Sequence, residues 1–267
     1  MTVQALYTAA TGMTALETKL DVVANNLANV ETTAFKTDRA NFEDLFYRHE
    51  KFPGAQDSAG QYTPTGISVG LGVRVASVQS DFAQGSIEQT NRPWDLAIEG
   101  QGFFQVMDPS GETLYTRAGT FSKNSNGDLV VGSASTGRLI EPPISIPNDA
   151  TDIVISPEGL VSVRQVGSQQ LAQVGQIELA MFVNPDGLLK LGENLYSETD
   201  ASGTPTLANP GQDGNGVLRQ GSLETSNVQP VHELIDLIKT QRAFELNSQV
   251  VQAGDEAMRI VANLKRY

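Results

Sequence analysis

Side chains that could carry out acid–base or metal chemistry are few and widely separated in this sequence. The chain has no cysteine, which excludes disulfides, thiol catalysis and cysteine-ligated metal centres, and its two histidines are His49 and His232. Asp95 and Glu99 stand four residues apart in a segment with strand character, where we interpret them as solvated carboxylates and not as a general acid–base pair. Trp94 is interpreted as a packed aromatic residue. The sequence therefore predicts no catalytic residue, no metal site and no cofactor.

The composition describes an acidic chain. Its 267 residues include 18 Lys and Arg against 31 Asp and Glu, a formal net charge of −13. Because binding to a phosphate backbone depends mainly on cations, nucleic acid is not an expected partner. No stretch approaches the roughly 18 apolar residues of a membrane span. The first residues lack the basic region and apolar run of a cleavable signal peptide, so we expect another route if the protein leaves the cytoplasm.

Apolar residues near the N-terminus follow a heptad pattern. One series recurs every seven residues and a second recurs three places later. The two series are Leu6, Met13, Leu20 and Leu27, and Ala9, Leu16, Val23 and Val30. This spacing predicts a helix with the narrow apolar seam of a coiled coil. Because Asn favours caps and turns, Asn25, Asn26 and Asn29 weaken the helix near its end, and residues 1–33 are predicted as an N-terminal helix.

The C-terminal residues repeat this design. Spacings of three and four connect one apolar series, and a second series widens the stripe. The two series are Ala243, Leu246, Val250, Ala253, Ala257, Ile260 and Leu264, and Leu237, Phe244, Val251 and Met258. Pro230 suits the first turn of a helix, so residues 227–267 are predicted as a C-terminal helix that begins near residues 227–230.

Between the helices the hydrophobic period changes to two, which is typical of strands. Strand candidates are residues 73–78, 103–106, 129–131, 152–155, 160–163 and 176–182. Residues 34–72 are predicted as an extended connector with β character, 73–198 as a central β domain and 199–226 as a return connector. The predicted fold class is α+β: a discontinuous coiled-coil helical domain formed by both termini, with a central, mainly β domain.

The partner of each helix is left open by the seam pattern. The end helices can pair across the long loop, because the entropy of loop closure rises by only about 0.6 kcal/mol per doubling of length. A pair of helices would leave apolar surface exposed to neighbouring subunits, which favours polymerisation. Alternatively, both helices pack against the β domain of a monomer.

Several segments resemble the flagellar rod and hook family. Residues 24–36, ANNLANVETTAFK, resemble its N-terminal signature, residues 223–228 and 238–245, LETSNV and IKTQRAFE, its C-terminal signature, and residues 100–106 and 115–119 its central motifs. The signature residues are Asn25, Asn26, Asn29, Phe35, Lys36, Thr225, Asn227, Gln241 and Arg242. Ala34 replaces the family's usual glycine, so a milder or shifted bend is expected there.

The resemblance implies a structural subunit and not an enzyme. Chain length and residues 42–73 favour the distal-rod branch, which implies a helical tube of identical subunits that transmits torque through the periplasm and leaves a central export channel. Implied partners are other copies of the chain, proximal-rod and hook subunits, the P and L ring proteins and the flagellar type III export apparatus. The residues expected at subunit packing are Leu6, Met13, Leu16, Leu20, Val23, Leu27, Leu237, Phe244, Leu246, Val251, Met258 and Ile260.

Other interpretations remain. A proximal-rod subunit shares both signatures, a secreted β-rich carbohydrate-binding or hydrolytic protein would use some of the many carboxylates, and a monomeric binding module would use the helices as braces. We also hypothesise that the end helices order only on assembly. Trypsin would then cut the monomer rapidly near its ends, at Lys19, Lys36, Lys239 and Arg242.

Overall fold

The computed structural model describes residues 2–54, 62, 65–133, 137–167 and 170–264. The chain divides into two compact units. Unit 1 consists of Met1–Ala28, Asp38–Ser80 and Gln229–Tyr267, and unit 2 consists of Asn29–Thr37 and Asp81–Val228. Among the described residues, no helix is long and apolar enough to cross a membrane.

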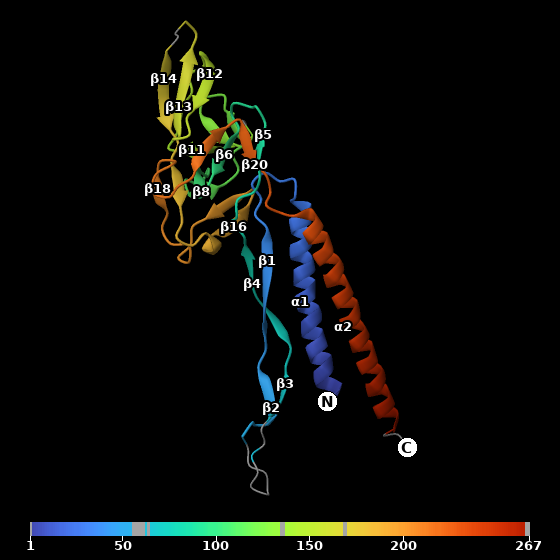
Figure 1. The fold of residues 1–267 in the computed structure, drawn as a ribbon. Coiled ribbons are helices and arrows are strands. Elements are labelled where there is room, and N and C mark those ends of the chain that lie inside the picture. The colour runs from blue at the N-terminus through green and yellow to red at the C-terminus, as the bar shows by residue number, and fades with distance from the viewer. Residues whose placement is uncertain (1, 55–61, 63–64, 134–136, 168–169, 265–267) are drawn as a thin grey trace. The chain divides into compact units, whose positions relative to one another are not determined.

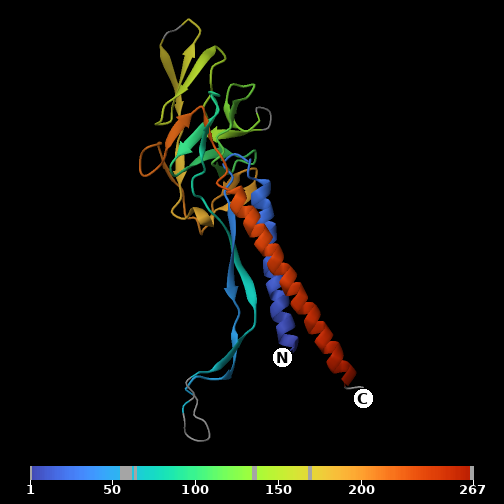
Figure 2. The same ribbon diagram turned by 45° about the vertical axis from the view of Figure 1, so that its right-hand side comes forward.

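Unit 1 contains the terminal helices and a long β ribbon. Its elements are α1 (Thr2–Ala28), β1 (Asp38–Asp44), β2 (Tyr47–Lys51), β3 (Ile67–Gly70), β4 (Val73–Ser80) and α2 (Pro230–Leu264). The helices pack side by side and run in opposite directions (Figures 1 and 2). α2 begins within the predicted range. α1 ends five residues before the predicted residue 33, because Asn29 starts a turn in which its side-chain oxygen accepts a hydrogen bond from the Thr32 hydroxyl at 3.1 Å.

The ribbon of unit 1 is formed by two antiparallel strand pairs. β1 pairs with β4 from Asp38 opposite Ser80 to Asp44 opposite Val73, and β2 pairs with β3. Asn26, only 1% exposed at the end of α1, holds the start of β1: its side chain donates to the Asp38 carbonyl and accepts from the Asp38 amide, both at 2.9 Å. The side chain of Asn26 thus binds the backbone of Asp38 as a neighbouring strand would.

Unit 2 is mainly β. Its strands are β5 (Ile87–Gln89), β6 (Leu96–Glu99), β7 (Phe103–Met107), β8 (Thr113–Thr116), β9 (Phe121–Lys123), β10 (Leu129–Val131), β11 (Arg138–Glu141), β12 (Ala150–Ile155), β13 (Leu160–Gln165), β14 (Leu171–Gln176), β15 (Leu179–Met181), β16 (Leu189–Gly192), β17 (Leu195–Ser197), β18 (Thr206–Ala208), β19 (Val217–Gln220) and β20 (Ser222–Glu224). A short 3-10 helix, η1, spans Pro185–Gly187. Within the described residues, the largest sheet has nine strands, and β12, β13 and β14 form a separate sheet.

The core of unit 2 comes from residues 96–218. Its main cluster packs Leu96 and Ile98 of β6 against Phe104 of β7 and Val161 of β13, all without solvent exposure. A second cluster is aromatic, with Phe103 meeting the rings of its neighbours edge to face at 5.5–5.9 Å between centroids. This arrangement is the usual one for aromatic pairs in protein cores.

The helical termini and the mainly β middle confirm the α+β class, while the coiled coil stays a prediction. The units differ from the predicted sections in two places. Residues 38–80 group with the helices, because the ribbon packs along α1. Residues 206–208 and 217–224, predicted as part of a return connector, are strands of unit 2 that pair with β15, β6 and β5.

Candidate functional site

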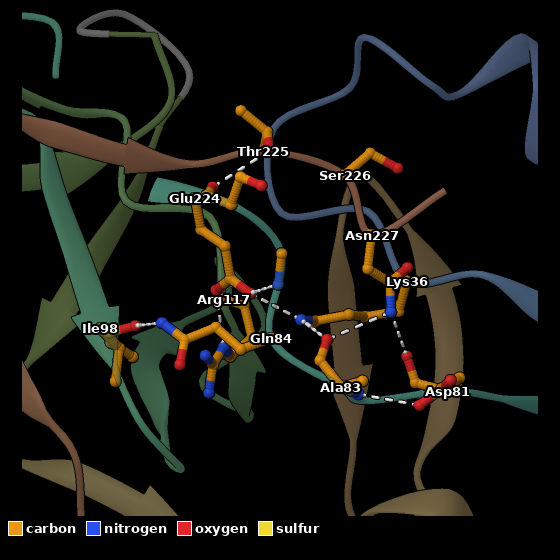
Figure 3. A network of polar contacts seen from close by, with 12 residues as sticks. Lys36, Asp81, Ala83, Gln84, Ile98, Arg117, Glu224, Thr225, Ser226 and Asn227 are labelled. Carbon is orange, nitrogen blue, oxygen red and sulfur yellow. Dashed lines mark hydrogen bonds and ion pairs between the residues drawn. The ribbon is translucent and has the colours of Figure 1, made fainter. Parts of the chain in front are cut away.

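A cluster of buried charged side chains lies in unit 2 (Figure 3). Lys36 Nζ is 2.7 Å from Glu224 Oε1, and neither side chain is exposed. The Lys36 ammonium also donates to the carbonyl of Ala83 at 2.8 Å. Arg117 Nε is 3.0 Å from Glu224 Oε2, and the amide of Gly85 donates to Glu224 Oε1 at 2.9 Å. One carboxylate therefore neutralises two cations that come from distant parts of the chain.

Arg117 is held in place independently of Lys36. It follows directly after β8, and its guanidinium donates to the carbonyls of Gly100 and Gly102 at 2.9–3.0 Å. Glu224 ends β20, whose pairing with β5 fixes the position of its backbone. Strand pairing and backbone carbonyls thus orient the Arg117–Glu224 pair, and Lys36 reaches it from the segment that follows α1.

Two cations, Lys36 and Arg117, share the Glu224 carboxylate as their ion-pair partner. Burial lowers the pKa of Lys36 below its ordinary value, the Glu224 carboxylate raises it in part, the Arg117 charge lowers it further and the Asp81 carboxylate raises it slightly. Loss of the Glu224 charge would leave two buried cations without their shared ion-pair partner. Breaking a buried ion pair in this way typically costs about 3–5 kcal/mol.

Asn227 connects three points at which the chain passes between the units. Its Oδ1 accepts hydrogen bonds from both the amide and the hydroxyl of Thr37 at 2.7 Å, and its Nδ2 donates to the carbonyls of Asp81 and Ala83 at 2.8 and 3.1 Å. The side chain thereby uses its full hydrogen-bonding capacity. The chain crosses between units after residues 28, 37, 80 and 228. Asn227 therefore holds three of these four crossings together.

The turn before Lys36 retains a left-handed residue. Ala34 has φ 55° and is 1% exposed, and its amide donates to the Glu224 carbonyl at 2.8 Å. The expectation of a milder or shifted bend was wrong, because Ala34 itself adopts a positive φ, the conformation that usually favours glycine. A left-handed conformation costs a non-glycine residue about 1–2 kcal/mol.

The remaining signature residues divide between the units. Thr225 donates from its hydroxyl to the Ser86 carbonyl at 3.0 Å, and Lys190 Nζ lies 5.4 Å from the centre of the Phe35 ring. Asn29 lies in the turn after α1, whereas Asn25 and the α2 residues Gln241 and Arg242 are exposed. The structure thus gathers Asn29, Phe35, Lys36, Thr225 and Asn227 in unit 2 and places Asn25, Asn26, Gln241 and Arg242 in unit 1.

None of the predicted packing residues of α1 is fully exposed to solvent. Val23 is buried, and the others are partly buried. Those others are Leu6, Met13, Leu16, Leu20 and Leu27.

Most of the predicted packing residues of α2 are exposed. Leu237 and Val251 are partly buried, whereas the other four are exposed. Those four are Phe244, Leu246, Met258 and Ile260, with 37–62% of their surface exposed. Their role in subunit packing stays a prediction.

α2 also contains a buried polar residue and a glycine that lies close to α1. Thr240 is 2% exposed, and its hydroxyl donates to the Asp236 carbonyl at 2.6 Å. At Gly254, a Cβ would lie 2.5 Å from Cδ2 of Leu6. The hydrophobic periodicity gave no signal for these two residues.

The residues considered for chemistry do not form a catalytic or metal site in the described ranges. No group of three or more His, Asp or Glu side chains there could hold a metal ion. Asp95 is 1% exposed and accepts a hydrogen bond from the Thr90 hydroxyl at 2.6 Å, so its interpretation as a solvated carboxylate was wrong. Glu99, His49 and His232 are exposed, and Trp94 packs on the main core as interpreted.

Known protein families match the segments of the chain that contain the signature residues. The flagella basal body rod protein family matches residues 6–36, the flagellar hook protein FlgE/F/G D1 domain matches residues 97–163, and the flagellar basal body rod FlgEFG protein C-terminal family matches residues 219–264. The flagellar basal-body rod protein FlgG of Caulobacter vibrioides is 47% identical over 98% of this chain and 99% of its own. The chain belongs to the flagellar basal-body rod family.

Other relatives agree with this membership of the flagellar basal-body rod family. FlgG of Agrobacterium fabrum is 45% identical over 98% of this chain and 100% of its own, and FlgF of Caulobacter vibrioides is 37% identical over 96% and 95%. A solved structure, the Helicobacter pylori flagellar hook protein FlgE2, matches 71% of this chain and 43% of its own at 16% identity with a TM-score of 0.25, too low a likeness to bear on the fold.

The buried cluster uses all three regions that identify the rod family. Lys36 is the last residue of the first matched region, Arg117 lies in the second and Glu224 lies in the third. Rod proteins are structural, and the contacts of this cluster all lie within unit 2 of the folded chain. Cleavage by trypsin after Lys36 is not expected in the folded chain, because the side chain has no exposed surface.

Proposed function

We propose that this chain is a structural subunit of the flagellar distal rod, which polymerises into a helical tube with a central export channel. One comparison carries the assignment to this branch. Two relatives come from Caulobacter vibrioides. The rod protein FlgG is 47% identical to this chain and the rod protein FlgF is 37% identical, each over at least 96% of this chain. The higher identity to FlgG than to FlgF favours the FlgG branch over a proximal-rod assignment.

An apolar face of α2 supports the polymerisation. Five of its aliphatic residues are 43–67% exposed and are separated by 4, 3, 8 and 14 positions. They are Val231, Ile235, Ile238, Leu246 and Ile260. These separations are close to whole helical turns of about 3.6 residues, so the five side chains lie along one side of the helix. Polar residues such as Arg242 and Gln249 interrupt this row, but several exposed aliphatic residues on one side of a helix are typical of a surface that another protein covers.

The ribbon of unit 1 supplies a second candidate contact. Phe46, Tyr47, Phe52 and Ile67 are 49–89% exposed along it. Because two paired strands alone are only marginally stable, neighbouring subunits would stabilise the ribbon. We infer that residues 42–72, of which 55–61 and 63–64 lie outside the described residues, make the contact that distinguishes a rigid rod from a bending hook.

The remaining parts of the proposal concern partners and location. The subunit would pass unfolded through the flagellar type III export apparatus, order its end helices on joining the tube, and adjoin proximal-rod and hook subunits. The tube would cross the periplasm inside the P and L rings and transmit torque. Family membership supports these statements, and it disfavours the secreted carbohydrate-active protein and the monomeric binding module.

The test is a pair of double variants in a motile host. Ile238→Asp with Ile260→Asp places two charges on the apolar face of α2, and we expect basal bodies without a distal rod and loss of motility. Gln252→Asp with Asn263→Asp adds the same charges at exposed polar positions of the same helix and should preserve both. Electron microscopy of isolated basal bodies shows whether the distal rod is present. Normal rods with the apolar-face variant would reject the proposed surface, and location of the protein at the proximal end would reject the distal assignment.

A further inference from the structure

Residues 29–37, here called the strap, belong to unit 2 although the whole ribbon separates them from the rest of that unit in sequence. The strap is attached mainly by polar contacts. Besides Lys36 and Thr37, the amide of Ala34 donates to the Glu224 carbonyl at 2.8 Å, and the Thr33 carbonyl accepts from Asn194 Nδ2 at 3.1 Å. The strap therefore lies on unit 2 through named hydrogen bonds and one ion pair.

Unit 2 retains its main core without the strap. The buried residues of the main cluster come from positions 96–218, so departure of the strap removes none of these side chains. The electrostatics point the same way. With Lys36 gone, Glu224 still faces Arg117 at 3.0 Å and still accepts from the Gly85 amide, and the remaining pair has no net charge. Arg117 also keeps its bonds to two backbone carbonyls.

Binding of the strap to unit 2 fixes the points at which the chain enters and leaves this unit. The amide of Asp81 donates to the Thr37 carbonyl at 2.8 Å, and Asn227 bonds to both residues. When the strap is bound, the chain therefore enters and leaves unit 2 at fixed neighbouring points. When it is released, Asn227 loses both of its bonds from Thr37.

We propose that the strap is a latch that opens and closes as a separate cooperative unit on a preformed Glu224–Arg117 pair. The latch closes when the Lys36 ammonium binds the Glu224 carboxylate and Thr37 binds the Asn227 side chain. The closed latch locks three of the four chain crossings, and the open latch frees residues 29–37 while the β core stays folded. The use of this latch in a load-bearing subunit rests on the proposed function, but its existence does not.

Amide hydrogen exchange of the full-length chain tests the latch. The reporters are the amides of Ala34, Thr37, Asp81 and Asn227, each of which bonds across the strap. The core references are the amides of β7 and β15. We expect the four reporters to exchange with one common protection that lies below that of the core, as separate opening units do.

The variant Asn227→Asp has a specific expected effect. It keeps the shape of the side chain but places a carboxylate oxygen against the carbonyls of Asp81 and Ala83, to which Nδ2 now donates. Reporter protection should fall about ten- to a hundredfold while core protection is unchanged. The matched control is Asn184→Asp, which removes a bond from Nδ2 to the Ala201 carbonyl elsewhere in unit 2 and should leave the reporters unchanged.

Two results would overturn the latch. One is that the wild-type reporters share the protection of the core, and the other is that Asn227→Asp lowers reporters and core together. If Asn227→Asp does not fold, Thr37→Val removes only the hydroxyl bond and should lower reporter protection about two- to tenfold. Because exchange is measured on the unassembled chain, failure of the latch and failure of rod assembly give separate results.

Discussion

Lys36 and Glu224 are 188 positions apart in the chain, yet their charged atoms lie 2.7 Å from one another and neither side chain is exposed. Arg117 shares the same carboxylate at 3.0 Å. The N-terminal, central and C-terminal regions of the rod family thus meet in one ion cluster. Glu224 is the anion on which this cluster depends.

Replacing the anion should cost more than replacing one of the cations. We expect Glu224→Gln to lower the free energy of unfolding of unit 2 by about 3–5 kcal/mol, because two buried cations then lose the carboxylate that both of them pair with. Lys36→Met should cost about 1–3 kcal/mol, since Glu224 and Arg117 still neutralise each other. Urea denaturation followed through Trp94, the chain's one tryptophan, measures both values.

The control for the charge variants is Lys123→Met. Lys123 is another lysine of unit 2 that donates to a backbone carbonyl, that of Pro147 at 3.1 Å. We expect a loss below about 1 kcal/mol. A smaller loss for Glu224→Gln than for Lys36→Met would contradict the central role of the carboxylate.

Ala34 should tolerate glycine and reject a branched side chain. Ala34→Gly relieves about 1–2 kcal/mol of left-handed strain and loses about 0.4–1 kcal/mol through greater freedom of the unfolded chain, so stability should stay equal or rise slightly. Ala34→Val should lose about 2 kcal/mol or more, because a β-branched residue is strained at φ 55° in a site that is 1% exposed. Thermal denaturation compares both with Ala172→Val, an exposed strand position expected to be neutral. Equal losses at the two valine positions would refute the strain argument.

The close approach of α2 to α1 at Gly254 should appear as coupling with Leu6. A leucine at Gly254 would collide with Leu6 Cδ2, whereas Gly12 has ordinary space, with a Cβ there lying 3.4 Å from Asn247 Nδ2. We expect Gly254→Leu to destabilise the helix pair by about 1–3 kcal/mol, and Leu6→Ala to restore about 1 kcal/mol of that loss in the double variant.

Gly12→Ala is the matched control on the same interface, and it should stabilise α1 by about 0.5–1 kcal/mol through helix propensity. Helical circular dichroism during thermal unfolding compares the wild type with all four variants. Simple additivity of the Gly254 and Leu6 effects would show that these two residues do not meet.

Tyr115 should make unit 2 sensitive to alkaline pH. Burial, with a smaller contribution from Glu198, raises the pKa of Tyr115 to about 12 from an ordinary value of 10.0. The folded chain then holds this proton between pH 10 and 12 whereas the unfolded chain releases it, so stability falls as pH rises through that window. The loss amounts to about 2–3 kcal/mol when complete.

Tyr115→Phe removes this titration. The difference in unfolding free energy between wild type and variant should be constant up to about pH 9 and should then change in favour of the variant. Comparison of the two proteins cancels the contribution of Lys36, whose lowered pKa acts in the opposite direction at high pH. A difference that does not vary up to pH 12 would contradict the raised pKa.

Local patterns were sufficient to predict much of the fold. The heptad spacing from Leu6 to Leu27 and the start signal at Pro230 predicted the end helices, and the strand candidates at residues 73–78 and 103–106 correspond to β4 and β7. These features depend on neighbours within a few residues. The sequence resemblance also placed Lys36 and Asn227 among the signature residues without indicating what they bind.

Periodicity and short motifs, which are local properties, were enough to predict the fold class, the family and the approximate extent of both helices. Only the folded chain shows that Lys36, Asp95 and Thr240 are buried and that Gly254 lies against Leu6 of α1. The burial of a charged residue depends on a counter-charge, and for Lys36 that charge is Glu224, brought within 2.7 Å by the folding of the intervening chain. A pattern of neighbouring residues cannot indicate a partner that lies 188 positions away in the sequence.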